Sequence, residues 1–106
     1  MELASVDFDE DGYLIDRAQW TPILAEELAA TESIILTANH WALIDAVRGY
    51  YAEFEHAPSM RPLVKWLKQT YGAEIGNSIY LHKLFPESPA KQLARIAGLP
   101  KPTKCL

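Results

Sequence analysis

Prolines and glycines divide this 106-residue chain into short segments, and their spacing constrains the fold more than any other feature. Proline inside a helix removes a backbone hydrogen bond, and glycine commonly ends a helix by adopting a left-handed conformation. Between these residues the apolar side chains recur at intervals of three and four, which is the period of an amphipathic helix. The boundary residues are Pro22, Pro58, Gly72, Pro86, Pro89 and Gly98. The sequence therefore predicts a mainly α, small helical bundle.

About five helices are predicted. The pairs Thr21-Pro22 and Ser88-Pro89 each place a capping residue before a proline at the first helical position. The predicted helices cover approximately residues 22–30, 38–57, 60–71, 75–85 and 89–97. Most of the aromatic residues fall on their apolar stripes and are expected in the core: Trp41, Tyr50, Tyr51, Trp66, Tyr71 and Tyr80. Trp66 lies off the main stripe of its helix, so it either packs against a second neighbour, which we favour, or is an exposed docking residue.

Both ends of the chain are predicted to be non-helical. Asp11-Gly12 lies between two short β-prone runs, which is a signal for a β-hairpin within residues 1–16. After Gly98, two prolines at positions 100 and 102 exclude a helix and favour extended backbone. We therefore predict a single domain, 1–106, with a hairpin at 1–16, a helical body at 20–98 and an extended, mobile C-terminal arm at 99–106.

Size and composition indicate an ordinary core without covalent or metal cross-links. At 106 residues with 49% hydrophobic residues, the chain is long enough to bury a core as one domain. No apolar run approaches the length of a membrane span, and no secretory signal is present, so we expect a cytoplasmic protein without a membrane partner. The net charge of −4 argues against direct, nonspecific binding to DNA or RNA.

Charge is unevenly distributed along the chain. Residues 1–16 carry six acidic side chains and no basic one, whereas residues 91–106 carry four basic side chains and no acidic one. The basic residues are Lys91, Arg95, Lys101 and Lys104. Two hypotheses remain open for this end: the charges are solvated and complement a helix dipole, or the basic arm is attracted to an anionic surface of a partner.

Cys105, the only cysteine, is the leading candidate for a catalytic residue. It is next to last in the chain, and the eight residues of the arm can span roughly 26 Å when fully extended. No hydrophobic pattern in the arm would bury the thiol. Lys101 and Lys104 favour its thiolate form, whereas the terminal carboxylate on Leu106 opposes it. With no second cysteine, an internal disulfide is excluded, and only thiol exchange with another protein is available.

The other candidate residues give weaker signals. His40 and His56 are sixteen residues apart, about 24 Å along a helix, so they cannot share a metal ion. His82 belongs to no metal-binding motif, and a core or surface role is expected for all three histidines. No glycine-rich phosphate loop and no Ser-His-Asp set are present, so we expect no metal and no cofactor.

Several motifs along nearly the whole chain resemble the DsrC/TusE family. They are Leu36-Thr37-x-x-His40-Trp41, Arg48-x-x-Tyr51-x-Glu53-Phe54, Pro58-x-x-Arg61, Tyr80-Leu81-x-x-Leu84-Phe85-Pro86 and Ile96-Ala97-Gly98-Leu99-Pro100-Lys101-Pro102-Thr103-x-Cys105. The last motif is the most specific. The resemblance implies a small helical protein with a mobile C-terminal arm, on which Cys105 carries sulfur.

The resemblance also implies partners and contact residues. The arm residues expected to contact partners are Gly98, Leu99, Pro100, Lys101, Pro102, Thr103 and Lys104. The two-cysteine DsrC branch has a second cysteine where this chain has Ala94, and commonly a glycine where it has Lys104. Both departures favour the single-cysteine, TusE-like branch. By that resemblance, Cys105 accepts persulfide sulfur from a TusBCD-like complex and passes it to an MnmA-type tRNA thiouridylase for 2-thiolation of the wobble uridine.

Two alternatives to this function remain open. The first is a DsrC-like partner or substrate protein of a dissimilatory sulfite reductase, against which the absence of a second cysteine counts. The second is a helix-turn-helix DNA-binding regulator, since the short connection at Pro58 permits that geometry. The acidic balance and the lack of a basic recognition helix count against the regulator.

Overall fold

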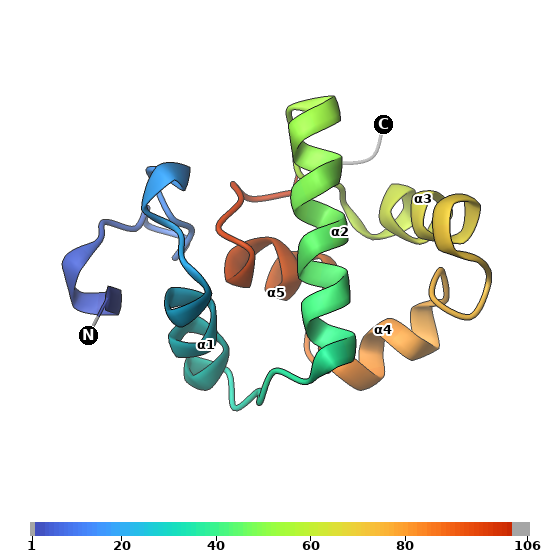
Figure 1. Cartoon of the computed structure of the whole chain (residues 1–106), viewed down its shortest axis with the longest axis horizontal. Helices are drawn as coiled ribbons and strands as arrows, with labels where there is room; N and C mark the ends of the chain where they lie inside the picture. The colour runs from blue at the N-terminus through green and yellow to red at the C-terminus, as the bar shows by residue number, and fades with distance from the viewer. Residues whose placement is uncertain (1, 103–106) are drawn as a thin grey trace.

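Five α-helices make up most of the computed structural model, which describes residues 2–102 (Figure 1). This confirms the prediction of a mainly helical fold. The helices are α1 (Pro22–Thr31), α2 (Ala38–Phe54), α3 (Met60–Tyr71), α4 (Ser78–Leu84) and α5 (Pro89–Ile96). Two short 3₁₀-helices, η1 (Glu2–Ser5) and η2 (Arg17–Gln19), precede them. No helix within residues 2–102 is both long enough and apolar enough to cross a bilayer.

The short helix α5 lies at the centre of the fold. It contacts α1, α2, α3 and α4, and in Figure 1 it lies between α1 and the long helix α2. Its side chains Leu93 and Ile96 are almost completely shielded from solvent. The other helices contribute most of the remaining large buried side chains, and three more lie outside the helices, at Pro58, Phe85 and Leu99. Those from the helices are Leu24, Leu28, Ile44, Val47, Leu63, Leu67 and Leu81. The end of α5, where the C-terminal segment begins, is therefore held by the core.

Hydrogen bonds from polar side chains define where α1 and α2 begin. Thr21 Oγ1 accepts the Leu24 N–H at 3.1 Å, as expected for an N-cap. At α2, His40 Nδ1 accepts the Thr37 N–H at 3.0 Å, so the ring proton is on Nε2, which donates to the Leu84 carbonyl at 2.8 Å. His40 is buried and both ring nitrogens are used. It therefore joins α2 to the end of α4 as a structural residue.

The predicted N-terminal β-hairpin is not formed in the described part of residues 1–16. The segment is a turn closed by one isolated antiparallel bridge between Phe8 and Leu14. The Asp9 carboxylate accepts the N–H groups of both Asp11 and Tyr13, each at 2.9 Å. Tyr13 and Leu14 are adjacent and both buried, whereas neighbouring residues of a strand point to opposite faces. Packing of both side chains against the body therefore prevents the two runs from pairing further.

The fourth helix begins later than the sequence predicts, at Ser78 instead of residue 75. Gly76 lies against the backbone of Lys68 in α3, where a Cβ atom would collide with it. The chain turns there, and the Asn77 side chain then caps α4 by accepting the N–H groups of Ile79 and Tyr80 at 2.8 and 3.3 Å. A contact between two backbones therefore sets the start of this helix.

Most of the aromatic residues predicted in the core are at least partly buried. Trp66 packs edge-to-face on Tyr50, with ring centroids 5.1 Å apart, which confirms the expectation of a second neighbour. The prediction is wrong for Tyr71, which is 52% exposed. Tyr71 is the last residue of α3, where the helix leaves the core at Gly72.

Tyr13 makes the stability of the fold sensitive to alkaline pH. Burial raises the pKa of its phenol, and Asp11, Asp9 and Glu32 raise it further, while Arg95 opposes them. Above the ordinary tyrosine pKa of about 10, the unfolded chain loses this proton before the native chain does. Stability is therefore expected to fall as the pH rises past about 10, and Tyr13→Phe should reduce the fall. Urea unfolding at about pH 8 and about pH 10.5 measures the difference.

Tyr71→Phe is the matched control, because Tyr71 is half exposed and lies at the end of α3. It should leave the alkaline loss of stability unchanged. An equal loss in wild type and Tyr13→Phe would contradict the assignment to Tyr13.

Candidate functional site

The C-terminal segment leaves the body through a defined helix-ending motif. The Leu99 N–H donates to the Ala94 carbonyl at 2.9 Å, and the Gly98 N–H donates to the Arg95 carbonyl at 3.2 Å. This pair of bonds is the Schellman motif, which requires a left-handed residue after the helix. Gly98 supplies that conformation, with φ of +76°. Leu99 is only 2% exposed, so it belongs to the core and fixes the point from which the segment departs.

Trp20, which precedes α1, packs against this end of α5. Its indole Nε1–H donates to the Ile96 carbonyl at 2.8 Å. A Cβ atom at Gly98 would collide with the Trp20 ring. Glycine is therefore required here both for its backbone conformation and for the close approach of the ring.

Arg48 of α2 supplies the hydrogen-bond donor for the last carbonyl group at the C-terminal end of α5. Its Nη1 donates to the Ala97 carbonyl at 2.7 Å, and its guanidinium lies over the Trp20 ring, 3.8 Å from the centroid. A cation at this end also complements the helix dipole. Burial lowers the pKa of Arg48, and the nearby Arg17 lowers it further, while Asp45 opposes them. The last carbonyl groups of α5 thus have side-chain or backbone partners, and the exit of the segment is rigidly defined.

The oppositely charged ends of the chain meet at this site. Lys101 Nζ lies 3.5 Å from Asp11 Oδ2, and both side chains are about half exposed. Arg95 Nε donates to the Gly12 carbonyl at 2.9 Å, and its Nη1 forms a salt bridge with Glu32 at 3.0 Å. Two of the four basic residues near the C-terminus are therefore paired within the molecule.

The structure places part of the predicted arm. Gly98 and Leu99 are buried, Pro100 and Pro102 are partly buried, and Lys101 is exposed. The remaining predicted site residues, Thr103, Lys104 and Cys105, lie outside the described residues. The sulfur chemistry assigned to Cys105, and the partner contacts of the whole segment, remain predictions.

Trp20, Arg48 and Arg17 were not identified as site residues from the sequence. Arg17 lies over the Tyr51 ring, 4.4 Å from the centroid, beside the Arg48–Trp20 stack. The only signal in the sequence is the motif Arg48-x-x-Tyr51, which places Arg48 and the stacking partner of Arg17 one turn apart on the same helix. The partners of that helix come from far along the chain, and no local pattern identifies them.

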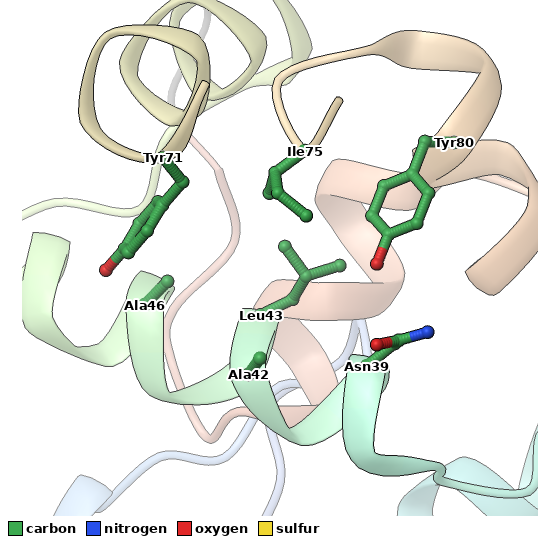
Figure 2. A pocket seen from close by; sticks show the side chains of 7 residues that line it. All are labelled: Asn39, Ala42, Leu43, Ala46, Tyr71, Ile75 and Tyr80. Carbon is green, nitrogen blue, oxygen red and sulfur yellow. The ribbon is translucent and has the colours of Figure 1, made fainter. Parts of the chain in front are cut away.

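A hollow of about 130 Å³ lies between α2, α3 and α4, away from the C-terminal segment. Figure 2 shows its lining residues: Asn39, Ala42, Leu43, Ala46, Tyr71, Ile75 and Tyr80. This lining offers apolar surface and tyrosine hydroxyls, without a carboxylate, thiol or imidazole. Within residues 2–102, no cluster of three or more histidine or carboxylate side chains could hold a metal ion. The hollow is therefore a less suitable site for sulfur chemistry than the C-terminal segment.

Curated proteins similar to this chain include several that are named Sulfurtransferase TusE. Sulfurtransferase TusE of Pectobacterium atrosepticum is 53% identical over 98 residues, which cover 92% of this chain and 90% of that protein. Sulfurtransferase TusE of Salmonella choleraesuis is 51% identical with the same coverage. These similarities extend over almost the full length of both chains.

Solved structures with the same fold include two DsrC proteins. The NMR structure of Allochromatium vinosum DsrC has a TM-score of 0.85 and 46% sequence identity, and the match covers 95% of this chain and 90% of that one. The oxidized gamma-subunit of the dissimilatory sulfite reductase (DsrC) of Archaeoglobus fulgidus has a TM-score of 0.78 and 42% identity, over 95% and 92% of the two chains. The family described as DsrC like protein matches residues 1–106. The chain therefore belongs to the DsrC-like family.

Proposed function

We propose that this protein is a sulfur-relay sulfurtransferase that carries persulfide sulfur on Cys105 toward 2-thiolation of the wobble uridine of tRNA. The observation that carries the proposal is the 53% identity, over 92% of the chain, to a protein named Sulfurtransferase TusE. The single cysteine supports it, because a carrier needs one thiol and no resolving partner. The rigid exit at Gly98 is consistent with a body that presents a segment to other proteins.

The proposed chemistry is thiol exchange and needs no external oxidant or reductant. The Cys105 thiolate attacks the terminal sulfur of a persulfide on the donor protein. A new S–S bond forms to Cys105, the S–S bond of the donor breaks, and the donor thiolate leaves with that electron pair. A thiolate of the acceptor protein then attacks the terminal sulfur on Cys105 and regenerates the Cys105 thiolate. Each step breaks one S–S bond and forms another.

The proposed partners follow from the TusE-like branch of the family. A TusBCD-like complex supplies the sulfur, and an MnmA-type tRNA thiouridylase receives it and binds the tRNA. We place the exchange in the cytoplasm, where free thiols stay reduced. The net charge of −4 is consistent with a carrier that meets tRNA through an enzyme.

A role as partner of a dissimilatory sulfite reductase is the second candidate. It is favoured by the DsrC structures that share the fold, at 46% and 42% identity. In the two-cysteine chemistry of that branch, the second cysteine stands where this chain has Ala94. Ala94 is 1% exposed, and its carbonyl is occupied by the Leu99 N–H. The sulfurtransferase is therefore the preferred function.

The intact mass of the protein after sulfur loading tests the proposal. The protein is incubated with a cysteine desulfurase, cysteine and the TusBCD-type donor complex. Wild type should gain about one sulfur atom, which a reductant removes, and Cys105→Ala should gain none. In cells that lack the wild-type gene, Cys105→Ala should leave tRNA without 2-thiouridine. Normal sulfur loading or normal 2-thiouridine in this variant would exclude Cys105 as the carrier.

A further inference from the structure

A polar pocket lies beside the start of the C-terminal segment, between η2 and α2. It has a volume of about 440 Å³ and is open to solvent. Its lining residues are Ile15, Asp16, Arg17, Ala18 and Arg48. Arg48 is also the residue that binds the Ala97 carbonyl at 2.7 Å. The pocket therefore shares a side chain with the base of the segment that leads to Cys105.

Both guanidinium groups of this Arg17–Arg48 pocket are positioned by aromatic rings and not by carboxylates. Arg17 lies over Tyr51 and Arg48 over Trp20, at 4.4 and 3.8 Å from the ring centroids. The two salt bridges within residues 2–102 are made by Arg95 and Lys101. Stacking restricts the two side chains before any ligand arrives, so less conformational entropy is lost on binding.

The two positive charges are close enough to repel each other. Arg17 contributes to the lowered pKa of Arg48, after burial, which is the larger cause. The carboxylates of Asp16 and Asp45 lie nearby, but among the described residues neither forms a salt bridge with Arg17 or Arg48. Asp16 accepts the Ala18 N–H at 3.0 Å, and Asp45 partly opposes the shift of Arg48. A bound anion would relieve this repulsion, and a guanidinium fork matches a carboxylate in shape.

We propose that the Arg17–Arg48 pocket receives a carboxylate side chain of the protein that donates sulfur to Cys105. This inference rests on the proposed function. Binding there would align the donor with the segment at the point where it leaves the body. Leu99 is fixed in the core, and the six residues from there to Cys105 can span roughly 20 Å when fully extended, so a donor at the pocket is within range of the thiol.

The chemistry of the other partners favours the donor as the occupant. A thiouridylase must bind tRNA phosphates and therefore needs cationic surface near its active site, which a pair of arginines would repel. Extended RNA needs a broad basic surface, whereas this pocket has two cations flanked by Asp16 and Asp45. A donor that binds no nucleic acid is free to present carboxylates.

Arg17→Glu is the variant that tests the pocket, because Arg17 is exposed and makes no bond to the α5 carbonyls. The probe is the purified TusBCD-type donor complex, and calorimetry measures its affinity for each variant at low and at physiological salt. Arg17→Glu should weaken binding by about tenfold or more, with a smaller salt dependence than wild type. Arg17→Lys should recover part of the affinity. Arg61→Glu, an equal charge reversal at an exposed position of α3, should bind within about twofold of wild type.

The outcomes separate this inference from the proposed function. If wild type is loaded with sulfur and Arg17→Glu binds and is loaded equally well, the pocket proposal is overturned and the proposed function stands. If Arg17→Glu weakens binding to the thiouridylase–tRNA complex and not to the donor, the occupant is not the donor. If wild type neither binds the donor nor gains sulfur, both proposals fail. An unchanged thermal midpoint of Arg17→Glu shows that the variant is folded.

Discussion

Gly98→Ala is expected to lower the free energy of unfolding by about 2–4 kcal/mol, from strain at a left-handed position plus a steric clash. Gly98 has φ of +76°, which an L side chain adopts only at a cost. A Cβ atom there would also collide with the Trp20 ring, which is held by its bond to the Ile96 carbonyl. Relief of the clash requires either loss of that bond or distortion of the helix end. Urea unfolding followed by circular dichroism measures the change.

Gly49→Ala is the matched control for this substitution. Gly49 lies within α2, and nothing lies within 4 Å of a Cβ atom built there. Since alanine favours the helix more than glycine does, Gly49→Ala should raise the free energy of unfolding by about 0.5–1 kcal/mol. Two identical substitutions should thus have opposite signs. A Gly98→Ala protein as stable as wild type would show that neither the backbone conformation nor the Trp20 contact constrains this position.

The helices were predictable because short-range chemistry decides where they lie. α1 and α5 begin at Pro22 and Pro89, as the pairs Thr21-Pro22 and Ser88-Pro89 predict. The Thr21 side chain caps α1, whereas Ser88 forms no side-chain capping bond, so proline is the effective signal at α5. Gly72 follows the last residue of α3, also as predicted. Each of these signals acts within four residues, so one sequence is enough to find it.

Two of the three differences from the predicted elements depend on distant contacts, and the third, at the end of α2, is local. The turn at residues 6–15 pairs at one bridge only, because Tyr13 and Leu14 both pack against the body. α4 starts at Ser78 because Gly76 meets the backbone of α3. α2 ends at Phe54, before the predicted residue 57, since Glu55 adopts a left-handed conformation. Propensity alone does not contain these contacts.

The same distinction applies to the candidate site. The helix end at Gly98 could be predicted, since glycine followed by two prolines signals it locally. The side chains that bind this end could not, because Trp20 and Arg48 are 76 and 49 residues from the carbonyls they contact. The sequence also left open whether the basic C-terminal residues are solvated or attract an anionic partner, and only the fold shows which acidic residues lie beside them. Arg95 and Lys101 are paired with Glu32 and Asp11, so their charges are partly compensated within the molecule.

Arg48→Ala is the second substitution with a large expected effect on stability. It removes a hydrogen bond from a charged donor to the Ala97 carbonyl, and Ala97 is fully buried. It also removes the stack on Trp20. A hydrogen bond from a charged group and a partly desolvated cation–π contact together predict a loss of about 2–3 kcal/mol in the free energy of unfolding. Urea unfolding measures it, and the C-terminal end of α5 should exchange its amide protons faster.

Arg48→Lys and Arg61→Ala separate this contact from the effect of charge alone. Lysine keeps the positive charge, but it has no planar group that could stack on Trp20 and at the same time donate to the Ala97 carbonyl. Arg48→Lys should therefore recover less than half of the free energy of unfolding that Arg48→Ala loses. Arg61 is exposed on α3, and Arg61→Ala should change stability by no more than about 0.5 kcal/mol. If Arg48→Lys were as stable as wild type, the positive charge near the helix end would suffice. The backbone conformation at the start of the C-terminal segment would then be fixed by the Schellman hydrogen bonds and by Trp20, and the planar guanidinium of Arg48 would not be required.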